Sequence, residues 1–442
     1  MEIQLSDHFN YGRLIRFTLP SIVMMIFTSV YSVVDGFFIS NFVGITPFAA
    51  INLIMPIAMI LGAFGFMFGT GGSALVAATL GAGQTKRANE IFTMLTYLAV
   101  SVGVVLAVVG IVFLEPVSSG MGADEGMLPY CVTYGQILLI ALPAFMLQNM
   151  FQSFLITAEK PAMGLIITII AGVTNIVLDA LFIVVFQWGI VGAAMATTVS
   201  QCVGGLIPLV YFSQKNSSLL QLGKTHFDVK TLIRTCTNGS SELVTNISMS
   251  VVSILYNFQL MKFAGENGVA AYGAVMYVSF LFVAIFLGYS IGVAPVIGFH
   301  YGAGDRDELK NLFRKSNVLI VSASLVLSAV AFILATPLAK AFVSKDALLL
   351  DMAATAFRYY AISVLFSGFS IFGSAFFTAL NNGLVSASIS FLRTLIFQIA
   401  SVIILPAIFA LNGVWYSLFV AEILSTGVTL MFYRTKRSVY HY

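Results

Sequence analysis

Long apolar stretches constrain this chain more than any other feature of its sequence. A helix of about 20 apolar residues crosses the roughly 30 Å hydrocarbon core of a bilayer. With 59% hydrophobic and only 9% charged residues, the chain has more apolar surface than one soluble globule can bury. We therefore predict an all-α polytopic membrane protein with twelve transmembrane helices. The predicted spans are residues 15–40, 47–80, 91–114, 130–158, 162–186, 190–212, 241–261, 270–301, 318–335, 353–380, 384–410 and 413–433.

Positive charge predicts the orientation of these spans. Most of the 21 Lys and Arg residues lie on the side of the N-terminus, among them Lys86, Arg87, Lys310 and Arg437. Short loops rich in Lys and Arg remain in the cytoplasm. We therefore expect a multi-pass protein of the inner (plasma) membrane with both termini cytoplasmic. The net charge of +3 includes no basic run, so we expect no nucleic-acid partner.

An internal repeat divides the chain into halves. Residues 42–92 align without a gap with residues 263–313, matching Gly71 with Gly292 and the Gly-Ala-Gly turn 81–83 with 302–304. Chance matching in so apolar a sequence is the alternative. Six spans in each half would give two parallel repeats, related by an axis along the membrane normal. We predict an N-terminal lobe of residues 1–212, a cytoplasmic linker of residues 213–238 and a C-terminal lobe of residues 239–442.

Ionisable side chains inside spans are expensive in lipid, and few occur here. Asp35 in the first span follows Tyr31 by one helical turn, and Asp179 in the fifth span follows Asn175 in the same way. Two carboxylates in a dry cavity cannot both ionise cheaply, so together they would form a proton-exchange site. The alternative is that each acid is separately hydrogen-bonded and purely structural. Further polar groups of this half are Gln148, Asn149 and Thr197.

Three charged residues in predicted spans of the second half are further candidates. Arg393 and Glu422, in adjacent late spans, would neutralise each other, which favours a structural ion pair. Glu242 lies near the start of the seventh span. There it would either stabilise the helix dipole from the first turn or serve as a secondary functional site.

Aromatic residues are abundant, with 39 Phe and 17 Tyr. Most must face lipid or neighbouring helices, but residues such as Tyr277, Phe280 and Phe372 could line a cavity that accepts flat organic cations. We therefore expect small organic, cationic substrates and the lipid bilayer as partners, and we expect a monomer.

The energy for transport would come from an ion gradient, because no nucleotide-binding motif occurs. Residues 81–86 read Gly-Ala-Gly-Gln-Thr-Lys, which lacks the spacing of a phosphate-binding loop. The three cysteines lie far apart, and no Cys/His cluster suggests a metal site. We expect no cofactor, no metal and no enzymatic activity, with H⁺ or Na⁺ as the coupling ion.

Three motifs and one proline carry a family resemblance. They are Pro20, Val-Tyr-Ser-Val-Val-Asp-Gly-Phe-Phe-Ile at 30–39, Asn-Ile-Val-Leu-Asp-Ala-Leu-Phe-Ile at 175–183 and Trp-Gly-Ile-Val-Gly-Ala-Ala at 188–194. Over nearly its whole length the chain resembles the multidrug and toxic compound extrusion (MATE) family of twelve-span exporters. The resemblance implies two six-helix lobes around a central cavity and the antiport of organic cationic drugs or toxic compounds.

Site residues also follow from this resemblance. Members of the DinF type bend the first span at a proline that matches Pro20. They bind the coupling cation in the N-terminal lobe, and the matching residues here are Tyr31, Asp35, Asn149, Asn175, Asp179 and Thr197. NorM-type members use acids of the seventh and tenth spans instead.

The tenth predicted span, residues 353–380, contains no acid, so we expect proton coupling through the N-terminal lobe. Sodium stays an alternative, because carboxylate and amide oxygens suit a hard cation. A lipid-linked oligosaccharide flippase is another alternative. It would need a basic cavity, whereas only Arg393 is a clearly intramembrane cation. The remaining alternative is a channel or a membrane scaffold, although neither needs two buried acids.

Overall fold

Helices make up the regular structure of the described chain. The computed structural model describes residues 3–342 and 347–442, and no strand occurs among them. This confirms the predicted all-α class. The first half contains α1 (Tyr11–Phe42), α2 (Ile45–Gly81), α3 (Thr85–Gly120), α4 (Leu128–Ile140), α5 (Leu142–Thr157), α6 (Pro161–Asp179), the π-helical turn η1 (Ala180–Val185) and α7 (Gly189–Ser213). The second half contains α8 (Val229–Ala303), α9 (Arg306–Ile333), α10 (Ala335–Phe342), α11 (Ala347–Ala379), α12 (Gly383–Phe391), the π-helical turn η2 (Leu392–Phe397) and α13 (Gln398–Tyr440).

Some of these helices contain more than one membrane crossing. α8 has 75 residues, and the positive φ of 61° at Gly265 divides it. α13 is divided in the same way at Ala410, where φ is 49°. Among the described residues, 9 helices are long and apolar enough to span a membrane, or 10 when α4 and α5, which meet at a 55° bend, count as one. Dividing the two long helices at their breaks gives the twelve crossings that the sequence predicts.

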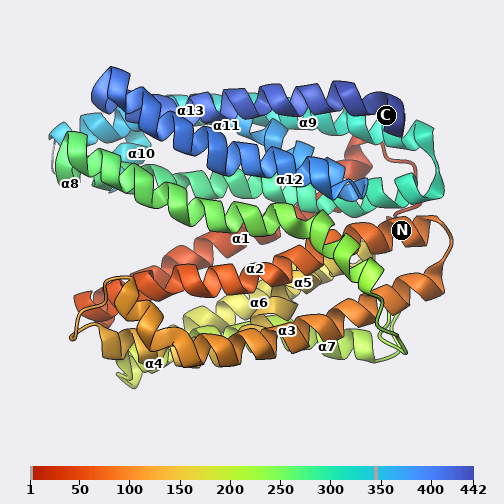
Figure 1. Cartoon of the computed structure of the whole chain (residues 1–442), viewed down its shortest axis with the longest axis horizontal. Coiled ribbons are helices and arrows are strands. Elements are labelled where there is room, and N and C mark those ends of the chain that lie inside the picture. Colours follow the sequence, from red (N-terminus) through yellow and green to blue (C-terminus); the bar gives the residue numbers. More distant parts are fainter. Residues whose placement is uncertain (1–2, 343–346) are drawn as a thin grey trace.

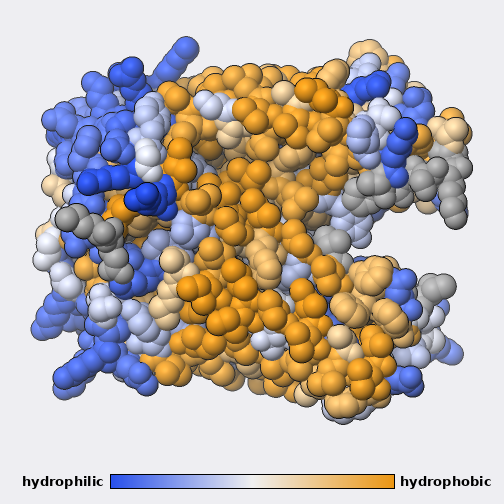
Figure 2. Space-filling model, turned by 180° about the vertical axis from the view of Figure 1, so that it is seen from behind, coloured by the Kyte–Doolittle hydropathy of each residue, from blue (hydrophilic) through white to orange (hydrophobic). Residues whose placement is uncertain are grey.

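The ends of the molecule differ in what they contain. Both termini and the connection from α7 to α8 lie at one end, which we call the termini end, while α4 and α10 lie at the opposite, far end (Figure 1). Figure 2 shows an apolar band between two hydrophilic ends and a notch at the far end. Exposed apolar side chains such as Val112, Ile254 and Ile408 are typical of such a band. Such a band matches the apolar core of a bilayer.

The two halves approach each other most closely where glycines meet backbone. A Cβ atom on Gly81 would lie 1.9 Å from the carbonyl oxygen of Phe299, and one on Gly302 would lie 1.9 Å from that of Ala78. In the predicted repeat, Gly81 matches Gly302 and Ala78 matches Phe299. The two contacts are therefore equivalent under the repeat. Any larger side chain would push α2 and α8 apart at the termini end.

The N-terminal segment connects both halves at the termini end. The backbone amide of Leu5 donates to Glu159 Oε1 at 2.6 Å, between α5 and α6. The amide of Phe9 donates to Glu308 Oε1 at 2.9 Å, and Lys315 Nζ donates to the carbonyl of Phe9 at 2.7 Å, both from α9. Leu5 and Phe9 are fully buried. Opening this end must either break these contacts or carry the segment with it.

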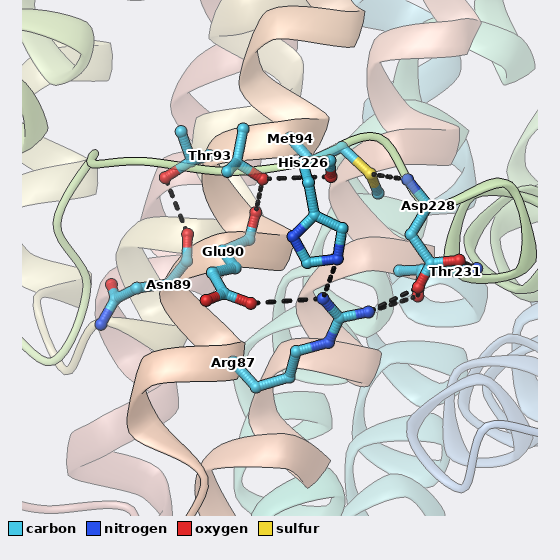
Figure 3. Close-up of polar contacts among 9 residues, drawn as sticks. Arg87, Asn89, Glu90, Thr93, Met94, His226, Asp228 and Thr231 are labelled. Carbon is cyan, nitrogen blue, oxygen red and sulfur yellow. Dashed lines mark hydrogen bonds and ion pairs between the residues drawn. The ribbon is translucent and has the colours of Figure 1, made fainter.

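The connection between α7 and α8 is bound to α3 through Arg87 (Figure 3). The Arg87 guanidinium pairs with Asp228 and donates to Thr231 Oγ1 at 3.2 Å. Asp228 caps the N-terminus of α8, where it accepts from the backbone amides of Lys230 and Thr231. Hydrogen bonds from Thr231, with those from Arg87 and Lys230, lower the pKa of Asp228 to about 2. The capped helix begins at Val229, inside the predicted linker of residues 213–238.

Candidate functional site

α1 and α6 bring Asp35 and Asp179 together. Asp179 is the last residue of α6 and is 0% exposed. Its carboxyl group lies within hydrogen-bonding reach of the carboxyl group of Asp35. The π-helical turn η1 follows Asp179 directly, and such turns are frequent at functional sites. Two acids from distant parts of the sequence therefore meet inside the first half of the protein.

Buried oxygen atoms without partners surround this carboxyl pair. Apart from the contact between the two carboxyl groups, several buried oxygens have no hydrogen-bond partner among the described residues. They are Asp35 Oδ1, Asn175 Oδ1, both carboxylate oxygens of Asp179 and Thr197 Oγ1. Buried polar atoms are almost always paired, so a missing partner needs an explanation. A proton or a hard cation would supply it. We call Asp35, Asn175, Asp179 and Thr197 the acid site.

Two tyrosines border the acid site. Tyr134, on α4, is fully buried; its hydroxyl group donates to the sulfur of Met55 at 3.8 Å and interacts with the charges of both aspartates. Sequence analysis missed Tyr134; its only sequence signal is a hydroxyl inside an apolar span. Tyr31 lies one turn before Asp35 on α1 and interacts with its charge. The structure therefore places Tyr31 beside Asp35, one of the two acids with which it was predicted to act.

Asn149 makes a different contact. It is 3% exposed, and its Nδ2 donates to the carbonyl oxygen of Gly62 on α2 at 3.4 Å. This bond fixes α5 against α2. Participation of Asn149 in a cation site stays a prediction.

Pro20 lies within α1, which is a continuous helix from Tyr11 to Phe42. Proline has no amide hydrogen, so the carbonyl of Arg16, one turn earlier, loses its helical partner. The helix is therefore locally weak at this point, which is where a bend would form. Bending at Pro20 stays a prediction.

Arg393 and Glu422 meet in the second half. Arg393 Nε lies 3.0 Å from both carboxylate oxygens of Glu422, and Arg393 Nη2 lies 2.9 Å from Oε1. This fork geometry is typical of strong Arg–carboxylate pairs. Glu422 is only 5% exposed. The arginine belongs to η2, so a π-helical turn accompanies the polar site of this half as well.

Glu242 does not lie in the first turn of a helix, so the interpretation that it stabilises a helix dipole was wrong. α8 begins at Val229 and is capped by Asp228. Glu242 lies about three and a half turns further along the same helix. The charge of a side chain at that depth no longer acts on the orphan amides of the first turn. A secondary functional role for Glu242 stays a prediction.

The aromatic residues proposed for organic cations lie in different surroundings. Phe372 is fully buried in the apolar core of the second half, whereas Tyr277 and Phe280 are half exposed. The exposed pair is available to lipid or to a substrate, but Phe372 is not.

Comparison with known proteins identifies relatives along the whole chain. The MatE family model matches it twice, at residues 20–181 and 243–404. The multidrug export protein MepA of Staphylococcus haemolyticus is 25% identical over 417 residues, which cover 93% of this chain and 90% of that protein. The crystal structure of a MATE protein in complex with MaL6 has a TM-score of 0.93 at 22% identity, covering 98% of both chains. The outward-facing conformation of a multidrug resistance MATE family transporter has a TM-score of 0.92 at 22% identity, covering 98% of this chain and 97% of that one.

Proposed function

The chain belongs to the MatE family, and from this premise we propose that it is a proton-coupled antiporter that exports organic cations. Membership makes it a multi-pass membrane transporter rather than an enzyme. The name of the related MepA protein supports export of several drugs. We further propose a monomer in the plasma membrane with both termini in the cytoplasm.

The contact between Asp35 and Asp179 carries the proposal of proton coupling. Two negative charges in contact away from water repel each other and lose their hydration. One proton shared between the carboxyl groups removes one charge and provides a donor between them. Loss of that proton restores the charge that attracts a cation. Proton and cationic substrate would then oppose each other's binding, which is the linkage that antiport requires.

The shape of the molecule supports a direction for this exchange. The halves are packed closely at the termini end, where Gly81 and Gly302 meet backbone, and a notch lies at the far end (Figure 2). With the termini in the cytoplasm, the notch faces outward, and protons would enter from that side. Exchange of one proton for one monovalent cation moves no net charge, so the proton concentration gradient would drive it, and each further proton per cycle would add about 2.3 kcal/mol per 100 mV of membrane potential.

Sodium is the second candidate for the coupling ion. The oxygens of Asp35, Asp179, Asn175 and Thr197 that lack partners are also suitable ligands for a hard cation. A flippase for anionic lipid-linked sugars has less support, because Glu422 already neutralises Arg393.

Substrate-induced proton release from purified protein tests the proposal. Wild type, Asp179→Asn and Glu242→Gln would each be given ethidium, a flat organic cation, in weak buffer. We expect release from wild type and from Glu242→Gln, and little from Asp179→Asn, because its amide cannot titrate. Equal release by Asp179→Asn would contradict a role for the acid site. If Na⁺ but not pH controlled ethidium transport, the coupling ion would be sodium.

A further inference from the structure

A groove lined mainly by basic side chains lies at the termini end of the second half. It encloses about 430 Å³. Its lining residues are Lys310, Arg434, Arg437, Ser438, His441 and Tyr442. Lys310 belongs to the first turns of α9, and the others belong to the last turns of α13 and the two residues after it. Two helices far apart in the sequence therefore supply one basic surface (Figure 1).

Aromatic contacts hold the walls of this basic groove in place. The buried ring of Tyr442 lies 4.5 Å from the ring of Phe313 on α9 and 4.9 Å from that of Phe376 on α11, centroid to centroid. The Tyr442 hydroxyl donates to the carbonyl oxygen of Tyr433 at 3.1 Å, and the Tyr433 ring lies 4.9 Å from that of Phe313. The end of α13 is therefore packed against α9, and the basic side chains extend from backbone that is fixed by this packing.

Two cations of the basic groove lack a countercharge. Lys310 and Arg434 make no ion pair with an acid of residues 3–342 or 347–442. Residues 434–442 contain no acid at all. The acid nearest to Lys310 along α9 is Glu308, which accepts from the backbone amide of Phe9 instead. Cations that line one groove repel each other, so a bound anion would stabilise them.

The helix surfaces that continue from the basic groove are apolar. On α9, Val318 and Leu325 are exposed. On α13, Leu430 and Met431 are exposed and lie one turn before Arg434. Exposed apolar side chains of a membrane-spanning helix face acyl chains. A molecule with an anionic head and an apolar tail would therefore match both surfaces, whereas a free phosphate ion would match only the basic one.

We propose that the basic groove binds the phosphate of an anionic phospholipid whose acyl chains lie along α9 and α13. The planar guanidinium groups of Arg434 and Arg437 suit phosphate oxygens, and Lys310 adds a point charge from the opposite wall. Basic pockets between membrane helices are typical binding sites for phospholipid headgroups. The bilayer also keeps headgroups at a high local concentration, which compensates for the screening of exposed charges by salt.

Such a lipid would connect α9 to α13 and so stabilise the second half. The acid site lies in the first half, so the lipid site does not depend on which ion drives transport.

Native mass spectrometry of delipidated protein in dodecyl maltoside tests the lipid site. Palmitoyl-oleoyl-phosphatidylglycerol, which is anionic, would be compared with phosphatidylcholine of the same acyl chains, which has no net charge. Lys310→Gln/Arg434→Gln removes the two cations without ion pairs. Lys86→Gln/Arg234→Gln is the matched control, because it removes the same charges from exposed side chains of the termini end that do not line the groove.

We expect the double variant to bind phosphatidylglycerol at least about tenfold more weakly than wild type, because it loses two charge-assisted contacts. Its affinity for phosphatidylcholine should be unchanged, and the control should bind both lipids as wild type does. Equal binding of phosphatidylglycerol by the double variant and wild type would overturn the proposal, as would equal affinity of wild type for the two lipids. If millimolar inorganic phosphate abolished the binding of phosphatidylglycerol, the groove would be a site for free phosphate, and the assignment to a lipid would be wrong. If the double variant does not fold, Lys310→Gln alone decides, with a severalfold loss expected.

Discussion

Removing one partner of the Arg393–Glu422 pair should destabilise this protein more than replacing both. Arg393→Met keeps most of the side-chain volume but leaves the Glu422 carboxylate, 5% exposed, without its three close nitrogen contacts. Neighbouring hydroxyls cannot replace the arginine. Tyr256 already donates to Gln398 Oε1 at 2.9 Å, and Tyr360 donates to the carbonyl of Ser279 at 3.4 Å.

The expected loss in the free energy of unfolding follows from the burial of the two side chains. Breaking a buried ion pair by removing one partner costs about 3–5 kcal/mol, whereas a neutral pair of similar volume is often as stable as the charged one. The Arg393 side chain is 16% exposed, which allows some water to reach the site and favours the lower limit of about 3 kcal/mol. The double variant Arg393→Met/Glu422→Gln should lose less than about 1 kcal/mol, since no unpaired charge remains.

Thermal unfolding of the four proteins of this cycle in one detergent provides the measurement. Wild type and the double variant should unfold at the highest temperatures, and Arg393→Met at the lowest. Glu422→Gln should fall between them, because the remaining arginine can extend toward water. If the loss in the double variant equalled the sum of the single losses, the two side chains would not interact, and the reasoning would be refuted.

Three further predictions concern the termini end. Gly302→Leu should abolish the close packing of α2 on α8 and lower the yield of folded protein. Gly427→Leu should be tolerated, because a Cβ atom on Gly427 meets nothing within 4 Å, and size-exclusion profiles would compare the two variants. Glu308→Ala should expose the N-terminal segment to limited proteolysis, and Asp307→Ala should not, because only Glu308 accepts from Phe9. The pKa of Asp228 is lowered to about 2, so its stabilisation of the start of α8 is complete above the ordinary pKa of the carboxyl group. That stabilisation is lost as pH falls toward 2. The protection of amides at the start of α8 against hydrogen exchange, relative to their intrinsic exchange rate at each pH, should therefore be unchanged from pH 8 to about pH 5, and a loss of protection between those values would contradict this sign.

Much of the fold could be predicted because lipid fixes the length of a span. The break at Gly265 lies between two predicted spans and the break at Ala410 lies at the last residue of one, although the chain on either side of each break is helical. α8 begins at Val229, inside the predicted linker of residues 213–238. Hydropathy alone does not identify its polar first turns, which follow the cap Asp228, as helix. The attachment of residues before α1 to both halves has no periodic signal, because it depends on backbone amides that every sequence has.

The charged members of the acid site are the clearest in the sequence. Asp35 and Asp179 stand out, because a carboxyl group inside a span is rare and costly. Tyr134 was not predicted, since uncharged polar side chains in a span are common and their partners depend on packing between helices. Glu242 was misinterpreted because its place in a helix depends on where that helix begins. Sequence therefore identifies the charges at the centre of a membrane site and the neutral groups one helical turn from them, such as Tyr31 and Asn175, but not a group such as Tyr134 that helix packing brings to the site.

The equivalent glycine contacts at the ends of α2 and α8 have a mechanical consequence. Because backbone meets backbone there, those points can turn but hardly separate, and each helix acts as a lever with its fulcrum at the glycine. α2 has 37 residues, so at 1.5 Å per residue its other end lies about 55 Å from the fulcrum and sweeps about 1 Å for each degree of rotation. A turn of about ten degrees would thus change the width of the notch by about the size of an organic molecule, without breaking the contact around which the halves turn.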